Sequence, residues 1–142
     1  PYMAQIVRNA QALAAALDKR GIPVLGAAKG YTRTHQVIAD ARPFGSGLDA
    51  AHLLARANLV TNKNLLPSDR PQDWDRPSGL RMGTIEVTRY GMREPEMDAI
   101  ADFVARVLVE KQPPESVIED VIEFRQAYQT LYYNFDHGMP PA

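Results

Sequence analysis

The chain has 142 residues, the length of one domain with a hydrophobic core of its own. Its net charge of −1 excludes a bulk electrostatic attraction to nucleic acid or to anionic membrane surfaces. The chain contains no cysteine, which excludes disulfides and thiolate chemistry, and no apolar stretch is long enough to cross a bilayer. We therefore expect a cytoplasmic protein that binds neither nucleic acid nor membrane.

The first part of the chain has a helical pattern followed by strand-like runs. Its apolar residues recur at helical spacing: Ile6, Ala10, Leu13 and Leu17. This spacing predicts a helix over 3–20, and Gly21 follows at the position of a left-handed C-cap. Two short segments, 22–25 and 35–40, are predicted as strands.

The middle of the chain is predicted to contain a helix, two strands and a long loop. Ser46 begins a capping-box pattern, which predicts a helix over 46–58. Strands are predicted over 59–62 and 79–84. The segment between them, 66–77, is rich in proline and aspartate and has no period, so we expect a surface loop. Loops of this length without structure of their own are uncommon unless they have a function.

Two helices are predicted in the last third of the chain. Glu94 and Pro95 begin the first of them, because proline suits the first helical turn, and Pro113 ends it. The final helix carries the clearest apolar stripe: Val117, Val121, Phe124, Tyr128 and Leu131. Strands thus alternate with helices over short links. We predict an α+β fold, a small mostly antiparallel sheet packed against helices.

Common signatures of metal and nucleotide sites are absent from the sequence. His35, His52 and His137 lack the spacing of metal ligands, and no metal site is expected. Neither G-x-G-x-x-G nor a P-loop pattern occurs. The G-S-G triplet at 45–47 could receive an anion at a helix N-terminus, but a turn followed by an N-cap is the preferred interpretation.

The most informative stretch is residues 62–92. It contains N-K-N-L-L-P at 62–67 and S-G-L-R-M-G-T at 78–84, separated by the predicted loop. Further motifs are N-A-Q-A-L-A at 9–14, H-Q-V-I-A-D at 35–40, F-R at 124–125 and Y-N-F-D at 133–136. Taken together and in this order, these segments resemble the C-terminal domain of the serine hydroxymethyltransferase family. The tail is similar to the archaeal-type branch of that family, and the resemblance covers essentially the whole chain.

The resemblance implies a fold-type I pyridoxal-phosphate enzyme that acts as a homodimer or higher homo-oligomer. Such enzymes transfer a one-carbon unit between serine and tetrahydrofolate. Residues 1–142 are then expected to be the single C-terminal small domain of this larger enzyme. The large domain, which binds the cofactor and supplies the Schiff-base lysine, lies outside the chain. We therefore expect no catalytic residue in this chain and no activity from the chain alone.

The resemblance assigns roles to two residues. Arg81, in the S-G-L-R segment, is expected to bind the substrate carboxylate, because a guanidinium grips a carboxylate through two parallel hydrogen bonds. Asn64, the second asparagine of N-K-N, is expected to contact the pterin ring, since an amide donates and accepts at once. Without the resemblance, Arg81 would be interpreted as a surface ion pair and Asn64 as a turn residue. Lys63 is expected to be a surface or loop-anchoring charge rather than the cofactor lysine.

The sequence also departs from the common pattern of the family. Ile85 and Glu86 follow Gly83-Thr84, where many members have proline. This places the chain nearer a divergent branch, for which tetrahydrofolate and a modified pterin are both open as co-substrate. One alternative function is a folate-independent aldolase or transaldolase that acts on threonine-like 3-hydroxy amino acids. Another is an inactive isolated domain that serves only as a binding or structural module.

Overall fold

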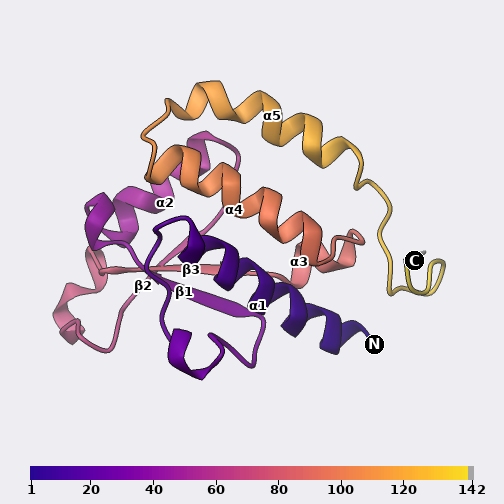
Figure 1. The fold of residues 1–142 in the computed structure, drawn as a ribbon, viewed down its shortest axis with the longest axis horizontal. Coiled ribbons are helices and arrows are strands. Elements are labelled where there is room, and N and C mark those ends of the chain that lie inside the picture. Colours follow the sequence, from indigo (N-terminus) through magenta and orange to yellow (C-terminus); the bar gives the residue numbers. More distant parts are fainter. Residues whose placement is uncertain (141–142) are drawn as a thin grey trace.

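A computed structural model describes residues 1–140, which form a small sheet covered by helices (Figure 1). The strands are β1 (Gln36–Asp40), β2 (Asn62–Asn64) and β3 (Gly79–Gly83). The α-helices are α1 (Tyr2–Lys19), α2 (Gly47–Arg56), α3 (Ile85–Arg89), α4 (Glu94–Leu108) and α5 (Pro114–Gln126). Short 3-10 helices are η1 (Ala27–Lys29), η2 (Arg42–Phe44) and η3 (Pro71–Asp75). No helix within residues 1–140 is long and apolar enough to span a membrane.

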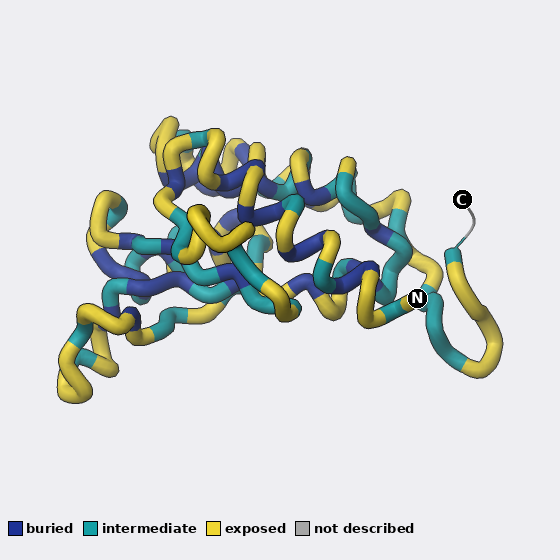
Figure 2. The backbone as a smooth tube through the Cα atoms, turned by 60° about the horizontal axis from the view of Figure 1, so that its bottom comes forward, coloured by how far each residue is buried: buried dark blue, intermediate teal, exposed yellow. Residues whose placement is uncertain are grey.

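The sheet is antiparallel with the strand order β1-β3-β2, so β3 is the central strand. One face of the sheet is apolar and packs into the core through Val37, Ala39, Leu80 and Met82, all of them buried. Buried positions gather where this face meets the helices, while the C-terminal tail is largely exposed (Figure 2). This arrangement confirms the predicted α+β fold.

Local signals set several boundaries correctly. Helix α1 begins and ends within one residue of its predicted bounds. Gly21 follows in the left-handed region, with φ of 84°, as its position predicts. Ser46 caps α2, because its Oγ accepts a hydrogen bond from the Asp49 backbone N–H at 3.2 Å. The G-S-G triplet therefore forms the turn and N-cap that the sequence favours.

Two predicted strands differ from the structure, and one helix was not predicted. The strand predicted over 22–25 is wrong: only an isolated bridge from Val24 to Ala39 forms there, and Pro23 has no N–H for a ladder. The strand predicted over 59–62 lies instead at Asn62–Asn64. Helix α3 was not predicted, since five residues are too few to show a period.

The final helix is also shorter than predicted. It ends at Gln126, so two members of the apolar stripe, Tyr128 and Leu131, lie beyond it. The tail turns away because its backbone bonds elsewhere: the Tyr132 N–H donates to the Arg89 carbonyl in α3 at 2.7 Å. A tertiary hydrogen bond thus takes precedence over a locally consistent helical pattern.

Candidate functional site

Arg81 lies at the centre of the sheet and projects away from the core. Its neighbours in β3, Leu80 and Met82, are buried on the core face, so the alternation of a strand puts the Arg81 side chain on the opposite face. In the register, Arg81 is paired with Ile38 of β1 and with Asn62 of β2. Flanking strands on both sides therefore fix the backbone that carries this half-buried guanidinium.

The Arg81 side chain is available to an external anion. Other arginines of the chain are engaged: Arg20 pairs with Asp98 at 2.9 Å and Arg56 with Glu115 at 2.5 Å. Within residues 1–140, no hydrogen bond or ion pair is found for the Arg81 side chain. Interpreting Arg81 as half of a surface ion pair would require an acidic partner, and these residues supply none. A half-buried guanidinium without an internal acid is suited to binding a carboxylate.

The acidic side chain on the same face is already neutralised. Asp40 is paired with Gly79 in the register and so lies on the face that Arg81 occupies. The Nε and Nη2 atoms of Arg42 donate to its carboxylate at 2.9 and 2.5 Å. These hydrogen bonds hold the pKa of Asp40 below its usual value. Arg42 therefore keeps Asp40 from pairing with Arg81.

Asn64 ends β2 on the same face of the sheet. It is paired with Gly79, two residues before Arg81. Its Nδ2 donates to the Leu65 carbonyl at 2.7 Å, which orients the side-chain amide. The described residues supply no donor to Oδ1, so this oxygen can accept a hydrogen bond from a ligand.

Gly79 makes the close approach of these strands possible. A Cβ at this position would lie 2.5 Å from the Asn64 carbonyl oxygen and 2.6 Å from Cδ2 of Leu66. Only glycine fits such a contact without a shift of the backbone. The glycine of the S-G-L-R segment therefore has a packing role beside the two candidate site residues.

The loop between β2 and β3 is tethered to its surroundings. Lys63 Nζ donates to the Asp75 carbonyl at 2.9 Å and lies 5.3 Å from the centroid of the Trp74 ring. The Arg76 guanidinium pairs with Asp49 of α2 at 2.5 Å. Lys63 thus anchors the loop, as the sequence predicts.

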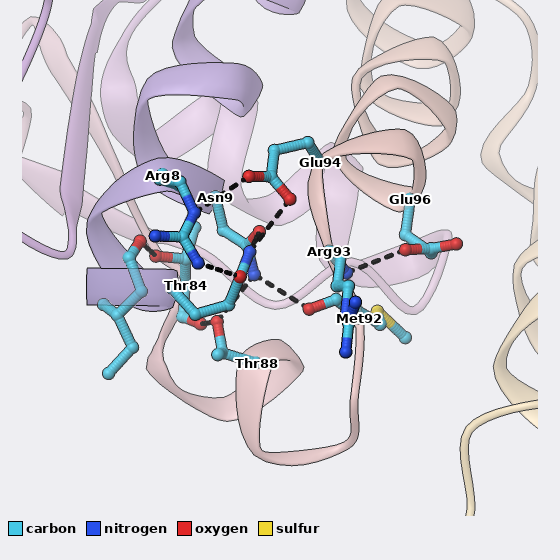
Figure 3. Close-up of polar contacts among 10 residues, drawn as sticks. Arg8, Asn9, Thr84, Thr88, Met92, Arg93, Glu94 and Glu96 are labelled. Carbon is cyan, nitrogen blue, oxygen red and sulfur yellow. Dashed lines mark hydrogen bonds and ion pairs between the residues drawn. The ribbon is translucent and has the colours of Figure 1, made fainter. Parts of the chain in front are cut away.

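A buried polar network holds the far end of β3 (Figure 3). Thr84, directly after the strand, donates its hydroxyl to the Ile6 carbonyl at 2.9 Å. Asn9 Nδ2 donates to Thr88 Oγ1 at 2.8 Å and to the Met92 carbonyl at 2.9 Å. Asn9 was not expected to be a site residue, although it interrupts the apolar stripe of its helix. A polar residue at such a position indicates a buried hydrogen-bond partner.

Two pockets found among residues 1–140 do not include the candidate residues. The larger, of about 520 Å³, lies among α4, α5 and the end of β3, with Phe103, Val104 and Phe124 in its wall. The smaller, of about 210 Å³, lies beside β1. Arg81 and Asn64 line neither of them and instead stand on the sheet face away from the core. Neither of these two pockets therefore encloses the two candidate residues.

Comparison with known proteins gives consistent matches. The family model for serine hydroxymethyltransferase matches residues 1–104. Proteins named serine hydroxymethyltransferase from Thermococcus kodakarensis and Methanocella arvoryzae are 52% and 50% identical over 98% and 95% of this chain. The chain spans about a third of the length of these relatives, 33% and 32%. Among solved structures, L-threonine transaldolase from Pseudomonas fluorescens, in its internal aldimine state, matches with a TM-score of 0.81 and 32% identity. That match covers 94% of this chain and 30% of the transaldolase.

Proposed function

Because the chain belongs to the serine hydroxymethyltransferase family, we propose that it forms the C-terminal domain of an enzyme that interconverts serine and glycine with a reduced folate. The observation that carries this proposal is Arg81, which lies on the open face of the central strand and has no side-chain partner among residues 1–140. The archaeal relatives, at about half identity, support the same assignment.

In this proposal Arg81 binds the carboxylate of the amino acid substrate. Two parallel N–H···O bonds from a planar guanidinium fix the orientation of the carboxylate as well as its location. Orientation matters because the reacting bond at the α-carbon has to be aligned with the cofactor before it can break. The β-ladders on both sides of Arg81 and the neutralised Asp40 support this role.

Asn64 is proposed to contact the pterin of tetrahydrofolate or of a modified pterin. Its amide oxygen has no donor among the described residues, and its orientation is set by the hydrogen bond to the Leu65 carbonyl. The oxygen of an amide held in this way can accept a hydrogen bond from an N–H group on the edge of a pterin ring. Its position on the same face as Arg81 fits a folate that lies beside the amino acid.

Pyridoxal phosphate is proposed as the cofactor, bound mainly by a large domain outside this chain. When bound, this cofactor withdraws electrons from the α-carbon of the substrate. The residues of this chain fit recognition of the substrate rather than of the cofactor: Lys63 Nζ is used to hold the loop at the Asp75 carbonyl. We accordingly propose that the chain alone has no activity.

The open site face and the relatives' length support a large domain as the partner that completes the site. The 86% exposure of Val60, an apolar side chain beside the larger pocket, fits burial against such a domain. A homodimer or higher homo-oligomer, in the cytoplasm, is part of the same proposal.

The second candidate is a folate-independent transaldolase or aldolase that acts on threonine-like 3-hydroxy amino acids. The structural match to L-threonine transaldolase supports it. Both candidates need a carboxylate-binding arginine, so Arg81 does not separate them, whereas a pterin-binding amide is needed only by the first.

The test is serine-to-glycine conversion by the full-length enzyme with and without tetrahydrofolate, for the unsubstituted protein and for Asn64→Ala. Gln72→Ala, which removes an exposed amide in the same loop, serves as the control. The proposal predicts strong folate dependence that Asn64→Ala weakens and Gln72→Ala leaves intact. Folate-independent cleavage of threonine, with no gain on adding tetrahydrofolate and no effect of Asn64→Ala, would establish the transaldolase or aldolase instead. The absence of both activities would leave the binding-module alternative.

A further inference from the structure

One carboxylate closes the base of the loop 65–78, which joins β2 to β3. Asp69 Oδ2 accepts hydrogen bonds from the backbone N–H of Leu66 at 2.8 Å and of Ser78 at 2.9 Å. The Ser78 hydroxyl also bonds to this carboxylate. The two amides belong to opposite ends of the loop, so a single side chain joins the residue that follows β2 to the residue that precedes β3.

These contacts favour the ionised form of Asp69. The hydrogen bond from the Ser78 side chain, then those from the Leu66 and Ser78 backbone, hold the pKa of Asp69 below its usual value. The carboxylate is therefore anionic throughout the neutral range, and its hydrogen bonds are charge-assisted. A long loop gains conformational freedom when such a link is removed.

The link lies directly beside the candidate site. Ser78 precedes Gly79, the residue paired with Asn64, and Gly79 lies two residues before Arg81. The other tethers of the loop, from Lys63 to Asp75 and from Arg76 to Asp49, hold its outer part. Among the described residues, Asp69 is the side chain that bonds the backbone of both loop ends.

We propose that Asp69 is a positioning residue for the substrate site. By joining Leu66 to Ser78, it fixes the end of β2, which carries Asn64, and the start of β3, two residues before Arg81. This inference rests on the proposed function of those two residues. Asp69 itself need not touch either substrate, and its effect is transmitted through the ladder between β2 and β3.

The first measurement is backbone hydrogen exchange of the 142-residue chain for Asp69→Ala, Asp69→Asn and Asp73→Ala. Asp73 is the matched control, because it lies in the same loop and, among the described residues, its carboxylate bonds only Arg70, through the backbone N–H and the guanidinium. Asp69→Ala should speed exchange of the Leu66 and Ser78 amides by at least about 10-fold, while Asp73→Ala leaves both unchanged. Unchanged exchange in Asp69→Ala would overturn the inference whatever the enzyme does.

The second measurement is steady-state kinetics of the same variants in the full-length, cofactor-loaded enzyme. Asp69→Ala should raise KM for serine and for tetrahydrofolate by roughly 10-fold each, a larger factor than the fall in kcat. Asp69→Asn keeps one acceptor oxygen and should recover most of this loss, to within about threefold of the unsubstituted enzyme.

The outcomes separate positioning from mere stabilisation. A variant that is only less stable contains less active enzyme, so its apparent kcat falls while both KM values stay the same, and this result would overturn the positioning role. If the unsubstituted enzyme neither converts serine nor cleaves threonine, the proposed function fails. The exchange measurement then decides by itself whether Asp69 closes the loop.

Discussion

Asn64 and Arg81 lie on the same face of the sheet, on the adjacent strands β2 and β3. Arg81 is paired directly with Asn62, so Asn64 is its diagonal neighbour, at a typical distance of roughly 7 Å. A carboxylate held by Arg81 and a second ligand held by Asn64 would therefore be neighbours. The sheet register, rather than closeness along the chain, brings the N-K-N and S-G-L-R motifs together.

Replacement of Arg81 by lysine should impair the enzyme although the charge is kept. A lysine ammonium cannot form the planar, two-point contact with a carboxylate, so we expect KM for serine to rise by about 10- to 100-fold and kcat to fall as well. The control is Arg33→Lys, a change at an exposed arginine outside the sheet, which should leave both constants unchanged. Equal KM values for Arg81→Lys and the unsubstituted enzyme would remove Arg81 from the site.

Removal of Arg42 should weaken substrate binding indirectly. Arg42→Ala frees Asp40, which lies diagonally from Arg81 on the same face, and the freed carboxylate then competes for the guanidinium. We expect KM for serine to rise about twofold to fivefold, with the largest effect at low ionic strength. Arg56→Ala, which breaks an exposed ion pair between α2 and α5, is the control. A salt-independent KM in Arg42→Ala would contradict this competition.

Two glycines of β3 should respond differently to alanine. In Gly79→Ala the new methyl group would meet the Asn64 carbonyl oxygen, and the forced shift should lower the free energy of unfolding by about 1–3 kcal/mol. In Gly83→Ala the nearest atom is Cδ2 of His35 at 3.9 Å, so the change should stay within about 0.5 kcal/mol. Urea unfolding of both variants tests this contrast, which fails if the two midpoints shift equally.

Asn9→Ala should strongly destabilise the chain. Asn9 is fully buried, and its removal leaves Thr88 Oγ1 and the Met92 carbonyl without their donor. We expect a loss of about 2–3 kcal/mol in the free energy of unfolding, measured by urea denaturation. Gln11→Ala, in the same helix, removes a single exposed hydrogen bond to the Thr32 carbonyl and should cost less than about 0.5 kcal/mol. Similar losses in the two variants would show that the network of Asn9 contributes little.

Tyr128 should ionise later than an ordinary tyrosine. Burial, followed by a hydrogen bond to Glu96, raises its pKa from 10.0 to about 12. Because the folded-state pKa is raised, the stability that Tyr128 contributes is complete below pH 10 and is lost as the pH rises through about 12. Tyrosinate absorbance should show this step in the unsubstituted chain and not in Tyr128→Phe. Glu96→Gln should move it to lower pH, and the assignment would be wrong if the absorbance that Tyr128→Phe removes titrates near pH 10.

Features that depend on local pattern could be predicted from the amino-acid sequence. Helices α1 and α4 follow from apolar spacing, and the Ser46 cap and the left-handed Gly21 follow from residue type at a helix end. The alternation of Leu80, Arg81 and Met82 also shows that Arg81 leaves the core. These signals are local because helical and strand periods are set by backbone geometry alone.

Which residues meet depends on the tertiary structure. Asn9 and Thr88, 79 positions apart, are joined by a hydrogen bond that no periodicity predicts. The docking of the tail on α3 and the closure of the loop by Asp69 likewise join segments that no local pattern relates. The same holds for the ion pair of Asp40 with Arg42 rather than with Arg81. Hydrogen bonds and ion pairs of this kind depend on where distant segments lie in space, which is fixed only when the core packs.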